Sequence, residues 1–386
     1  MGEEPSPPPA PDTAALARRL AAGEVVAVPT ETVWGLAAAP AVGGPAAAAR
    51  RLSTLKGAPE DRPYALHFAG LDDLARALPR LAPGLPDWLA AHLPGPWTVV
   101  LPTRLAPPPG GPEAPDWPWP TVGLRVPDHP TFAAVARAAP RFAGAAALFA
   151  TSVNEHGEPP LAGAELAAWL AARGVATAAP PPGEPGGREP SQPPQPSRVV
   201  AFSPLPRLLR GEAAAEALRP GRRVLVVCTG NSCRSPLAAA LLRQELAAAW
   251  GVAASDLPAL GWVVESAGTA AAPGAPASEG SRRAAAEVGL DLEDHRTRPL
   301  ARALADGPWD EVLVMGGHHG VVVEGLGHRA APFDPEGHDV PDPFGGDLET
   351  YRAVRERLAE AARQRVAAWS SWEDATGQRP RHSATT

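Results

Sequence analysis

The sequence has very little cysteine and very little lysine. Cys228 and Cys233 are the only cysteines in 386 residues, and Lys56 is the single lysine among 35 Lys and Arg residues. Two cysteines cannot make a disulfide scaffold, so we expect a reducing compartment. The preference for arginine is typical of a genome-wide base composition, which makes the position of the one lysine informative.

Long apolar runs and basic blocks are missing as well. No run approaches the roughly 18 consecutive apolar residues of a membrane-spanning helix, and the N-terminus lacks the apolar core of a secretory signal. The net charge is −7 without a basic block, which argues against non-specific nucleic-acid binding. We therefore expect a soluble cytoplasmic protein that has no membrane partner.

The length and the alternation of β-branched runs with Ala/Leu/Arg segments predict an α/β protein with two domains. A Pro- and Gly-rich stretch in the first domain cannot build a packed element, so it is expected to be a loop. The second domain alternates strands and helices, which predicts a parallel, doubly wound sheet. The expected parts are a disordered tail at 1–12, a first domain at 13–212 with the Pro-rich loop at 180–196, a linker at 213–220, a second domain at 221–372 and a disordered tail at 373–386.

Individual elements can be predicted from the same patterns. Strands are expected at 24–30, 97–102, 121–127, 197–202, 222–227, 262–269 and 309–315. Helices are expected at 74–82, 164–174 and 347–369.

Both cysteines fall in one short turn, VCTGNSCRSP, between an apolar run and a helix that carries Pro236 in its first turn. A turn from a buried strand into a helix N-terminus points several backbone N–H groups into one concavity, and the helix dipole adds positive potential. Such a turn can bind a phosphate-sized dianion. The same field favours a thiolate at Cys228, while Arg234, six residues later, can grip two phosphate oxygens.

These parts suit attack of the Cys228 thiolate on phosphorus, which gives a phosphocysteine that water then hydrolyses. Expelling the leaving group needs a proton donor. Asp342 in HDVPDPFGG is the candidate, because an Asp beside bound phosphate stays protonated more readily. A metal site at the two cysteines is the competing interpretation, but no C-x2-C spacing or nearby His supports it. The adjacent His318 and His319 are interpreted as solvent-facing loop residues.

The stretches VCTGNSCRSP, ESAGT and DVPDPFGG, together with the closing helix, resemble the low-molecular-weight protein phosphatase family. The resemblance implies that Cys228 is the nucleophile, Arg234 the phosphate clamp and Asp342 the general acid, with no cofactor. His295 would hydrogen-bond the loop, and Cys233 would capture an oxidised Cys228 as a reversible disulfide. The phosphate-binding loop would contain Thr229, Gly230, Asn231, Ser232, Cys233 and Ser235, of which Asn231 and Ser235 brace the loop and Ser235 assists thiolate departure.

The resemblance implies that the substrate of this half is a phosphoprotein or a small phosphomonoester, and phosphotyrosine and phosphoarginine both stay open. Tyrosine-specific members of the family usually carry a bulky aliphatic residue at the Ser232 position and Tyr after the D-P pair. Here Ser232 and Phe344 occupy these positions, which looks more like the bacterial protein-arginine phosphatase branch. The loop also resembles thioredoxin-linked arsenate reductases, but those need further cysteines to relay a disulfide.

The first domain resembles the threonylcarbamoyl-AMP synthase (YrdC-like) family in VPTETVWGLA, LSTLKGAPEDRPYALHF, LPGPWTVVLP, VGLRVPDHP and ATSVNEHGEPP. The resemblance implies a twisted α/β sheet with a positively lined cavity that condenses ATP, threonine and bicarbonate for tRNA modification. Such a site must neutralise triphosphate charge while pyrophosphate leaves, and Mg²⁺ is the expected helper. A compact ammonium at a tight phosphate site is not freely replaced by a guanidinium. By motif position, the nucleotide- or threonine-binding residues are Thr32, Lys56, His67, Arg125, Ser152, Asn154, Ser197 and Arg210.

Several positions depart from the family pattern. Ala58 stands where K-G-R-P has a phosphate-binding Arg, and Arg62 is the candidate replacement. The S-A-N triplet reads S-V-N at Val153, and S-T-V-V reads S-R-V-V at Arg198. The alternative is therefore a phosphatase fused to a catalytically degenerate nucleotide- or RNA-binding module. The acidic charge balance gives RNA or tRNA-modification partners no independent support.

Overall fold

The computed structural model describes residues 12–107, 117–177, 195–203 and 205–373. Nearly all of both expected tails and of the Pro-rich loop at 180–196 lies outside these residues. The chain divides into two compact units. The first contains residues 1–81 and 89–214, and the second contains residues 82–88 and everything from 215 onward.

Within its described residues, the first unit contains one mixed sheet of nine strands in the order β7-β1-β2-β6-β3-β5-β4-β8-β9. Three of the neighbouring pairs are parallel, namely β1 with β7, β3 with β5, and β4 with β8, and the others are antiparallel. The strands are β1 (Val26–Val28), β2 (Gly35–Ala38), β3 (Ala65–Phe68), β4 (Trp97–Pro102), β5 (Thr121–Arg125), β6 (Ala147–Ser152), β7 (Ala176–Thr177), β8 (Arg198–Phe202) and β9 (Pro206–Arg210).

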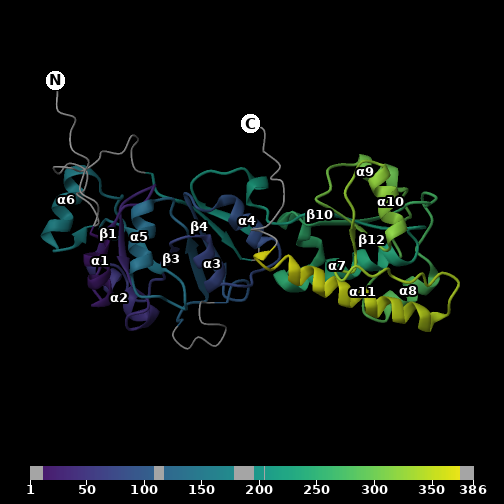
Figure 1. Ribbon diagram of the computed structural model, residues 1–386, viewed down its shortest axis with the longest axis horizontal. Helices are drawn as coiled ribbons and strands as arrows, with labels where there is room; N and C mark the ends of the chain where they lie inside the picture. The colour runs from purple at the N-terminus through teal and green to yellow at the C-terminus, as the bar shows by residue number, and fades with distance from the viewer. Residues whose placement is uncertain (1–11, 108–116, 178–194, 204, 374–386) are drawn as a thin grey trace, which may run out of the picture. The chain divides into compact units, whose positions relative to one another are not determined.

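Helices of the first unit flank its sheet (Figure 1). They are α1 (Thr13–Ala21), α2 (Gly44–Lys56), α3 (Leu71–Ala77), α4 (Leu85–His92), α5 (Pro130–Ala138) and α6 (Gly163–Ala172), and α4 begins in residues of the second unit. Leu20 of α1, Phe132 of α5 and Leu148 of β6 lie in one buried cluster. The α2 helix ends at Lys56 and is capped by Gly57, whose left-handed φ of 63° suits glycine. The helix expected at 74–82 is correct only for 74–77, because α3 ends at Ala77, ahead of Pro79.

The second unit has a sheet in the order β11-β10-β12-β13, and all three strand pairs are parallel. This confirms the predicted doubly wound α/β class. Figure 1 shows α9 and α10 on one side of the strands and α7, α8 and α11 on the other. The elements are η1 (Ala215–Leu218), β10 (Arg223–Cys228), α7 (Arg234–Trp250), η2 (Ala254–Leu260), β11 (Val263–Gly268), α8 (Glu279–Ala286), α9 (Leu300–Ala305), β12 (Glu311–Val314), α10 (Gly317–Gly325), β13 (Ala331–Pro332) and α11 (Leu348–Ala368).

Residues 82–88 are an integral part of the second unit, which the sequence did not indicate. Arg222 is buried there and pairs with Asp87 and with Glu311. Both carboxylates raise the pKa of the Arg222 guanidinium and outweigh its burial. The Trp88 indole nitrogen donates to the carbonyl oxygen of Ala217 at 2.8 Å.

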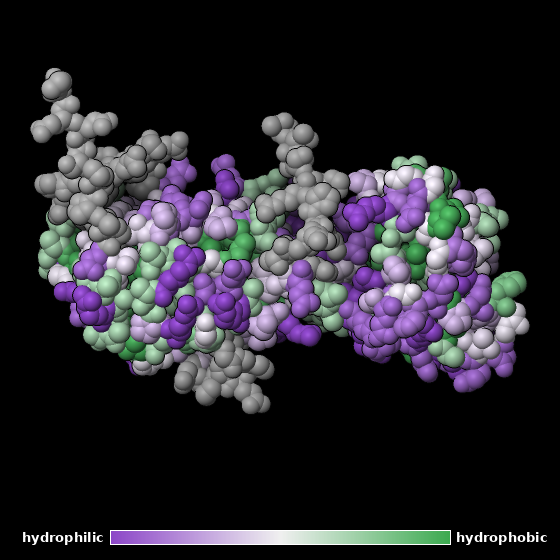
Figure 2. Space-filling view, in the orientation of Figure 1, coloured by the Kyte–Doolittle hydropathy of each residue, from purple (hydrophilic) through white to green (hydrophobic). Residues whose placement is uncertain are grey.

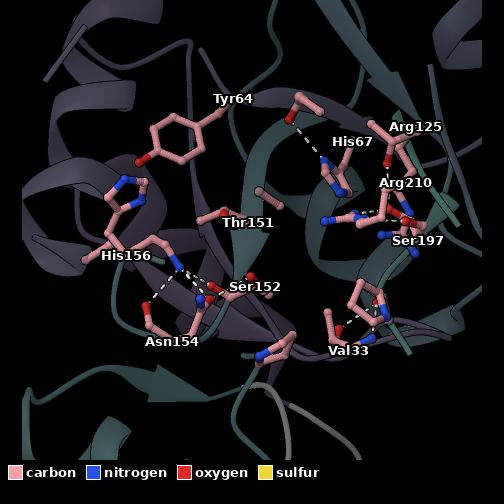
Figure 3. A pocket seen from close by; sticks show the side chains of 18 of the residues that line it. Val33, Tyr64, His67, Arg125, Thr151, Ser152, Asn154, His156, Ser197 and Arg210 are labelled. Atoms are coloured by element: carbon pink, nitrogen blue, oxygen red, sulfur yellow. Dashed lines mark hydrogen bonds between the residues drawn. The ribbon is translucent and has the colours of Figure 1, made fainter. Parts of the chain in front are cut away.

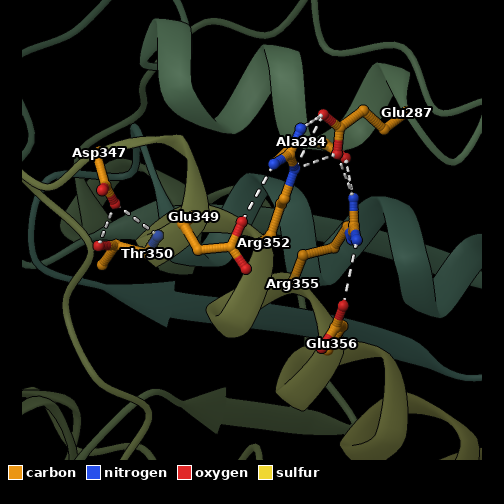
Figure 4. Close-up of polar contacts among 8 residues, drawn as sticks. All are labelled: Ala284, Glu287, Asp347, Glu349, Thr350, Arg352, Arg355 and Glu356. Carbon is orange, nitrogen blue, oxygen red and sulfur yellow. Dashed lines mark hydrogen bonds and ion pairs between the residues drawn. The ribbon is translucent and has the colours of Figure 1, made fainter.

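The contact between α8 and α11 combines surface ion pairs with tight packing. Arg352 and Arg355 of α11 both reach the carboxylate of Glu287, which follows α8 (Figure 4). In Figure 2 hydrophilic side chains gather along the edge of the second unit where α11 runs. Exposed ion pairs contribute little stability, so the buried side of this contact decides its strength. None of the described helices combines the length and the apolar character needed to cross a bilayer.

We predict that Gly280→Ala destabilises the second unit. A Cβ at Gly280 of α8 would lie 2.4 Å from the ring of Tyr351 on α11, closer than real Cβ contacts allow. Overpacking should cost about 1–3 kcal/mol of the free energy of unfolding, although alanine favours a helix by about 1 kcal/mol. Chemical denaturation measures this cost. Gly325→Ala at the end of α10, where no atom lies within 4 Å of the added Cβ, is the matched control. Equal loss in both variants would contradict the packing argument.

Candidate active sites

The turn between β10 and α7 brings the predicted nucleophile to the start of a helix. Cys228 is the last residue of β10, and α7 begins at Arg234. The Cys228 sulfur is buried, accepts the backbone N–H of Asn231 at 3.2 Å, and lies 3.1 Å from the Ser235 hydroxyl oxygen. The sulfur therefore lies at the base of a loop, with one backbone N–H directed at it and a hydroxyl beside it.

Asn231 holds this turn in shape. It has a positive φ of 53°, which is uncommon for a residue other than glycine. Its amide nitrogen donates to the hydroxyls of Ser235 at 2.9 Å and Ser266 at 2.8 Å, and its amide oxygen accepts from the Arg298 backbone at 2.9 Å. The predicted support from His295 is present, since its Nε2 lies 2.7 Å from the Asn231 carbonyl oxygen. Burial lowers the pKa of His295, which favours the neutral ring.

Arg234 and Asp342 meet directly. Arg234 is 5% exposed, and its guanidinium donates to the Val340 carbonyl at 3.1 Å and to the Asp342 carboxylate at 2.6 Å. Asp342 is half-exposed and also accepts the backbone N–H of Phe344 at 3.2 Å. The structure thus places the three predicted catalytic residues at one site, with the 78% exposed Phe344 beside it. A phosphoryl group that binds Arg234 has to compete with Asp342 for the guanidinium.

The second cysteine faces other side chains than the first does. Cys233 caps α7, and its sulfur lies 3.6 Å from the Tyr351 hydroxyl, in a cluster with Ala284. Both cysteines are free thiols. The disulfide that the family resemblance implies stays a prediction. Among the other loop residues, Gly230 is exposed and Ser232 is half-buried.

His319 was missed at the sequence level. It is buried, and its Nε2 lies 2.9 Å from the Thr229 hydroxyl oxygen, so the interpretation as a solvent-facing loop residue is wrong for His319. His318 is exposed as expected, but it belongs to helix α10 and not to a loop. A signal was present, because His319 closely follows β12, which runs parallel to β10. The carboxyl ends of neighbouring parallel strands meet at the same edge of a sheet, where ligands bind.

The first unit contains a pocket of about 400 Å³ that gathers most of the residues predicted there. Figure 3 shows Arg125, Arg210, Ser197 and His67 at one end, and Tyr64, His156 and Asn154 at the other. Thr32 is not in the lining but contacts Arg125, whose Nη2 donates to the Thr32 hydroxyl at 2.7 Å. The predicted residues in the lining are Lys56, His67, Arg125, Ser152, Asn154, Ser197 and Arg210.

Arginine side chains give the pocket its positive charge. Arg125 is 4% exposed and pairs with Glu31 at 2.7 Å, yet its buried Nε has no partner in the described part of the chain. Arg210 donates from Nε to the Ser197 carbonyl at 2.7 Å. Burial, with a contribution from Arg125, lowers the pKa of His67 to about 3, so this ring is neutral. The unpaired Nε of Arg125 is a donor that an anionic ligand could satisfy.

The Lys56 ammonium makes more hydrogen bonds within the protein than we expected for a group that binds a phosphate. Its ammonium donates to the Ser152 carbonyl at 2.6 Å, to the Asn154 carbonyl at 2.9 Å and to the Asn154 side-chain oxygen at 2.6 Å. An ammonium has three N–H groups, so all three serve the 152–154 turn. Burial and the neighbouring Arg62 lower the pKa of Lys56 to about 8. The lysine therefore shapes the pocket wall and remains charged at neutral pH.

Arg62 supplies a cation near the position where Ala58 departs from the family pattern. It lines the pocket, and Ala58 does not. Its Nη1 lies 2.6 Å from His156 Nδ1, and its guanidinium carbon lies 5.8 Å from the Tyr64 ring centroid. Among the described lining residues, Glu158 carries the only carboxylate. The residues present therefore do not build a protein cage for Mg²⁺, which usually takes carboxylate ligands besides phosphates.

One other group in the described residues brings metal-ligand atoms together. The ligand atoms of Asp334, Glu336 and His338 lie within 4.8 Å of one another. Glu336 and His338 are exposed, and Arg357 already contacts Asp334 at 3.3 Å. A cation beside the most buried carboxylate weakens the attraction of this group for a metal ion.

Comparisons with known proteins match each unit separately. Residues 18–174 match the family model Sua5_yciO_yrdC, described as telomere recombination. Residues 223–371 match the model of the low molecular weight phosphotyrosine protein phosphatases. A threonylcarbamoyl-AMP synthase of Halorhodospira halophila is 39% identical over 147 residues, which cover 37% of this chain and 69% of that protein.

Two relatives of the second unit differ in the substrate that their names state. A protein-arginine-phosphatase of Geobacillus stearothermophilus is 35% identical over 144 residues, 35% of this chain and 88% of that protein. The low molecular weight protein-tyrosine-phosphatase Wzb of Escherichia coli K12 is 35% identical over 150 residues, 36% of this chain and 90% of that protein.

Proposed function

The chain belongs to two families, Sua5/YciO/YrdC through residues 18–174 and the low molecular weight phosphotyrosine protein phosphatases through residues 223–371, and on that premise we propose that its phosphatase domain works through a phosphocysteine at Cys228. The observation that carries the proposal is the position of the Cys228 sulfur, which accepts the Asn231 amide and lies beside the Ser235 hydroxyl. Arg234 and Asp342 lie at the same loop and pair with each other.

The proposed reaction has two steps. In the first, the Cys228 thiolate attacks phosphorus, an S–P bond forms, and the bond from phosphorus to the leaving group breaks while Asp342 gives that group a proton. In the second, water attacks phosphorus, the S–P bond breaks, and inorganic phosphate leaves as the Asp342 carboxylate takes up a proton. Arg234 stabilises the charge on the phosphoryl oxygens in both steps. The Ser235 hydroxyl donates to the departing thiolate.

We predict that Cys228→Ser lowers kcat for an aryl phosphate by at least about 10³-fold, as removal of a nucleophile does. Binding of inorganic phosphate should persist, because the loop amides and Arg234 remain. Cys233→Ser removes a sulfur that contacts Tyr351 and should keep measurable turnover. Steady-state kinetics of the full chain measure this effect. Undiminished hydrolysis by Cys228→Ser would contradict the phosphocysteine mechanism.

Phosphoarginine is the proposed substrate in preference to phosphotyrosine. Ser232 is a small residue at the half-buried position in the loop, which leaves room for a planar guanidinium beside the phosphorus. We predict a higher kcat/KM for a phosphoarginine peptide than for the matching phosphotyrosine peptide. Ser232→Ile should reduce this ratio by roughly tenfold, a difference typical of one misfitting group in a pocket. A wild-type preference for phosphotyrosine would contradict the assignment.

For the first unit we propose synthesis of threonylcarbamoyl-AMP from ATP, threonine and bicarbonate, with release of pyrophosphate. Support comes from the pocket lined by Arg62, Arg125 and Arg210, since a triphosphate needs several cations. Mg²⁺ would enter with ATP as part of the substrate. The alternative is a module that binds a nucleotide or RNA without turnover.

We predict pyrophosphate release that requires both ATP and threonine. Arg62→Ala should raise KM for ATP by about tenfold, because one charge-assisted contact to phosphate is worth about 1.5–3 kcal/mol. Arg18→Ala, on the exposed side of α1, is the control and should behave as wild type. ATP binding by calorimetry without any pyrophosphate release would favour the binding module instead.

A further inference from the structure

His319 is a fully buried histidine beside the phosphate-binding loop, and no step proposed above uses it. It is 0% exposed and belongs to α10, which follows the parallel neighbour of β10. Its ring packs against that of His318, with the centroids 3.8 Å apart. A polar ring taken out of water needs a hydrogen-bond partner to offset the loss of solvation.

The partner of the buried ring is a hydroxyl of the loop. His319 Nε2 lies 2.9 Å from the Thr229 hydroxyl oxygen, and in the described residues Nδ1 has no partner. Burial lowers the pKa of His319 to about 4, and the charges of His318 and Arg234 contribute in the same direction. The ring is therefore neutral near pH 7 and places no second positive charge beside Arg234.

Thr229 links this histidine to the guanidinium that faces the substrate. Its hydroxyl oxygen accepts from Arg234 Nη2 at 3.5 Å, while the other acceptor of Nη2 is Asp342 at 2.6 Å. When a phosphoryl group takes the place of Asp342, Thr229 is the protein acceptor that remains on Nη2. Thr229 is exposed, so its side chain is free to occupy other staggered rotamers unless something fixes it.

We propose that His319 is a positioning residue of the phosphatase site: its hydrogen bond fixes the Thr229 hydroxyl, and that hydroxyl orients Arg234 toward the phosphoryl group. The inference rests on the phosphatase function proposed above and adds a residue that makes no contact with the substrate. It predicts that loss of the bond weakens the binding of every phosphoryl ligand, because Arg234 contacts substrate and product alike.

The test measures kcat and KM for an aryl phosphate and Ki for inorganic phosphate, on the full chain. His319→Leu should raise both KM and Ki by about 3- to 10-fold, the range of one neutral hydrogen bond. His319→Gln should restore both values to within about twofold of wild type, because its side-chain amide can bond to the Thr229 hydroxyl. A residue that only supports folding would lower the amount of active enzyme, and hence kcat, without changing KM or Ki.

A double-mutant cycle separates this bond from packing. Thr229→Val keeps the shape of Thr229 without its hydroxyl and should raise KM and Ki as His319→Leu does. In the combined variant, KM and Ki should be no higher than in either single variant, since both substitutions remove the same bond. Val321→Ala, at a 70% exposed position of the same helix, is the control and should behave as wild type. If His319→Leu does not fold, Thr229→Val alone decides, because it must reproduce the rise in KM and Ki.

Two outcomes would overturn the inference while leaving the phosphatase intact. One is an unchanged KM and Ki in both single variants, and the other is a combined variant whose effects multiply. A wild-type chain that fails to hydrolyse the aryl phosphate, or a Cys228→Ser variant that retains full activity, would instead remove the proposed function and this inference with it.

Discussion

The phosphatase site depends on the hydrogen bonds that hold Asn231 in a left-handed conformation. This backbone is unfavourable for most residues, yet the side chain of Asn231 donates to two hydroxyls and accepts one backbone N–H, while His295 holds its carbonyl. These bonds turn the Asn231 N–H toward the Cys228 sulfur. The loop is therefore shaped before a substrate arrives, and little reorganisation is needed during the reaction.

A buried cation has the corresponding role in the first unit. The three acceptors of Lys56 all lie in the 152–154 turn, so the ammonium fixes one wall of the pocket. Its three N–H groups are used within the protein, and the arginines are the cations with donors to offer a ligand. A guanidinium is planar and could not reach three acceptors in this compact arrangement. This gives a physical reason why a lysine occupies this position in a chain that otherwise uses arginine.

The sequence was informative where local chemistry decides the structure. The strands expected at 97–102 and 197–202 appear as β4 and β8 with nearly the same bounds, and Cys228, Arg234 and Asp342 come together as the motif suggested. Prediction failed where distant segments meet. No local pattern places residues 82–88 in the second unit, and the burial of His319 follows from the pairing of β12 with β10. The bonding of Lys56 likewise depends on a turn almost a hundred residues away.

Both sites keep their buried cations paired with internal acceptors, and this has a consequence for selectivity. Arg234 pairs with Asp342 and Arg125 with Glu31, because an unpaired buried charge is costly. A phosphoryl group that bonds to Arg234 Nη2 must therefore displace Asp342, whereas the unpaired Nε of Arg125 can donate to a ligand while Glu31 stays bound. A phosphoryl dianion carries more negative charge than a carboxylate and so competes well with Asp342 for Arg234. Asp342 thus acts as an internal competitor at the phosphatase site, whereas the first unit leaves a donor open to less highly charged anions such as a carboxylate or bicarbonate.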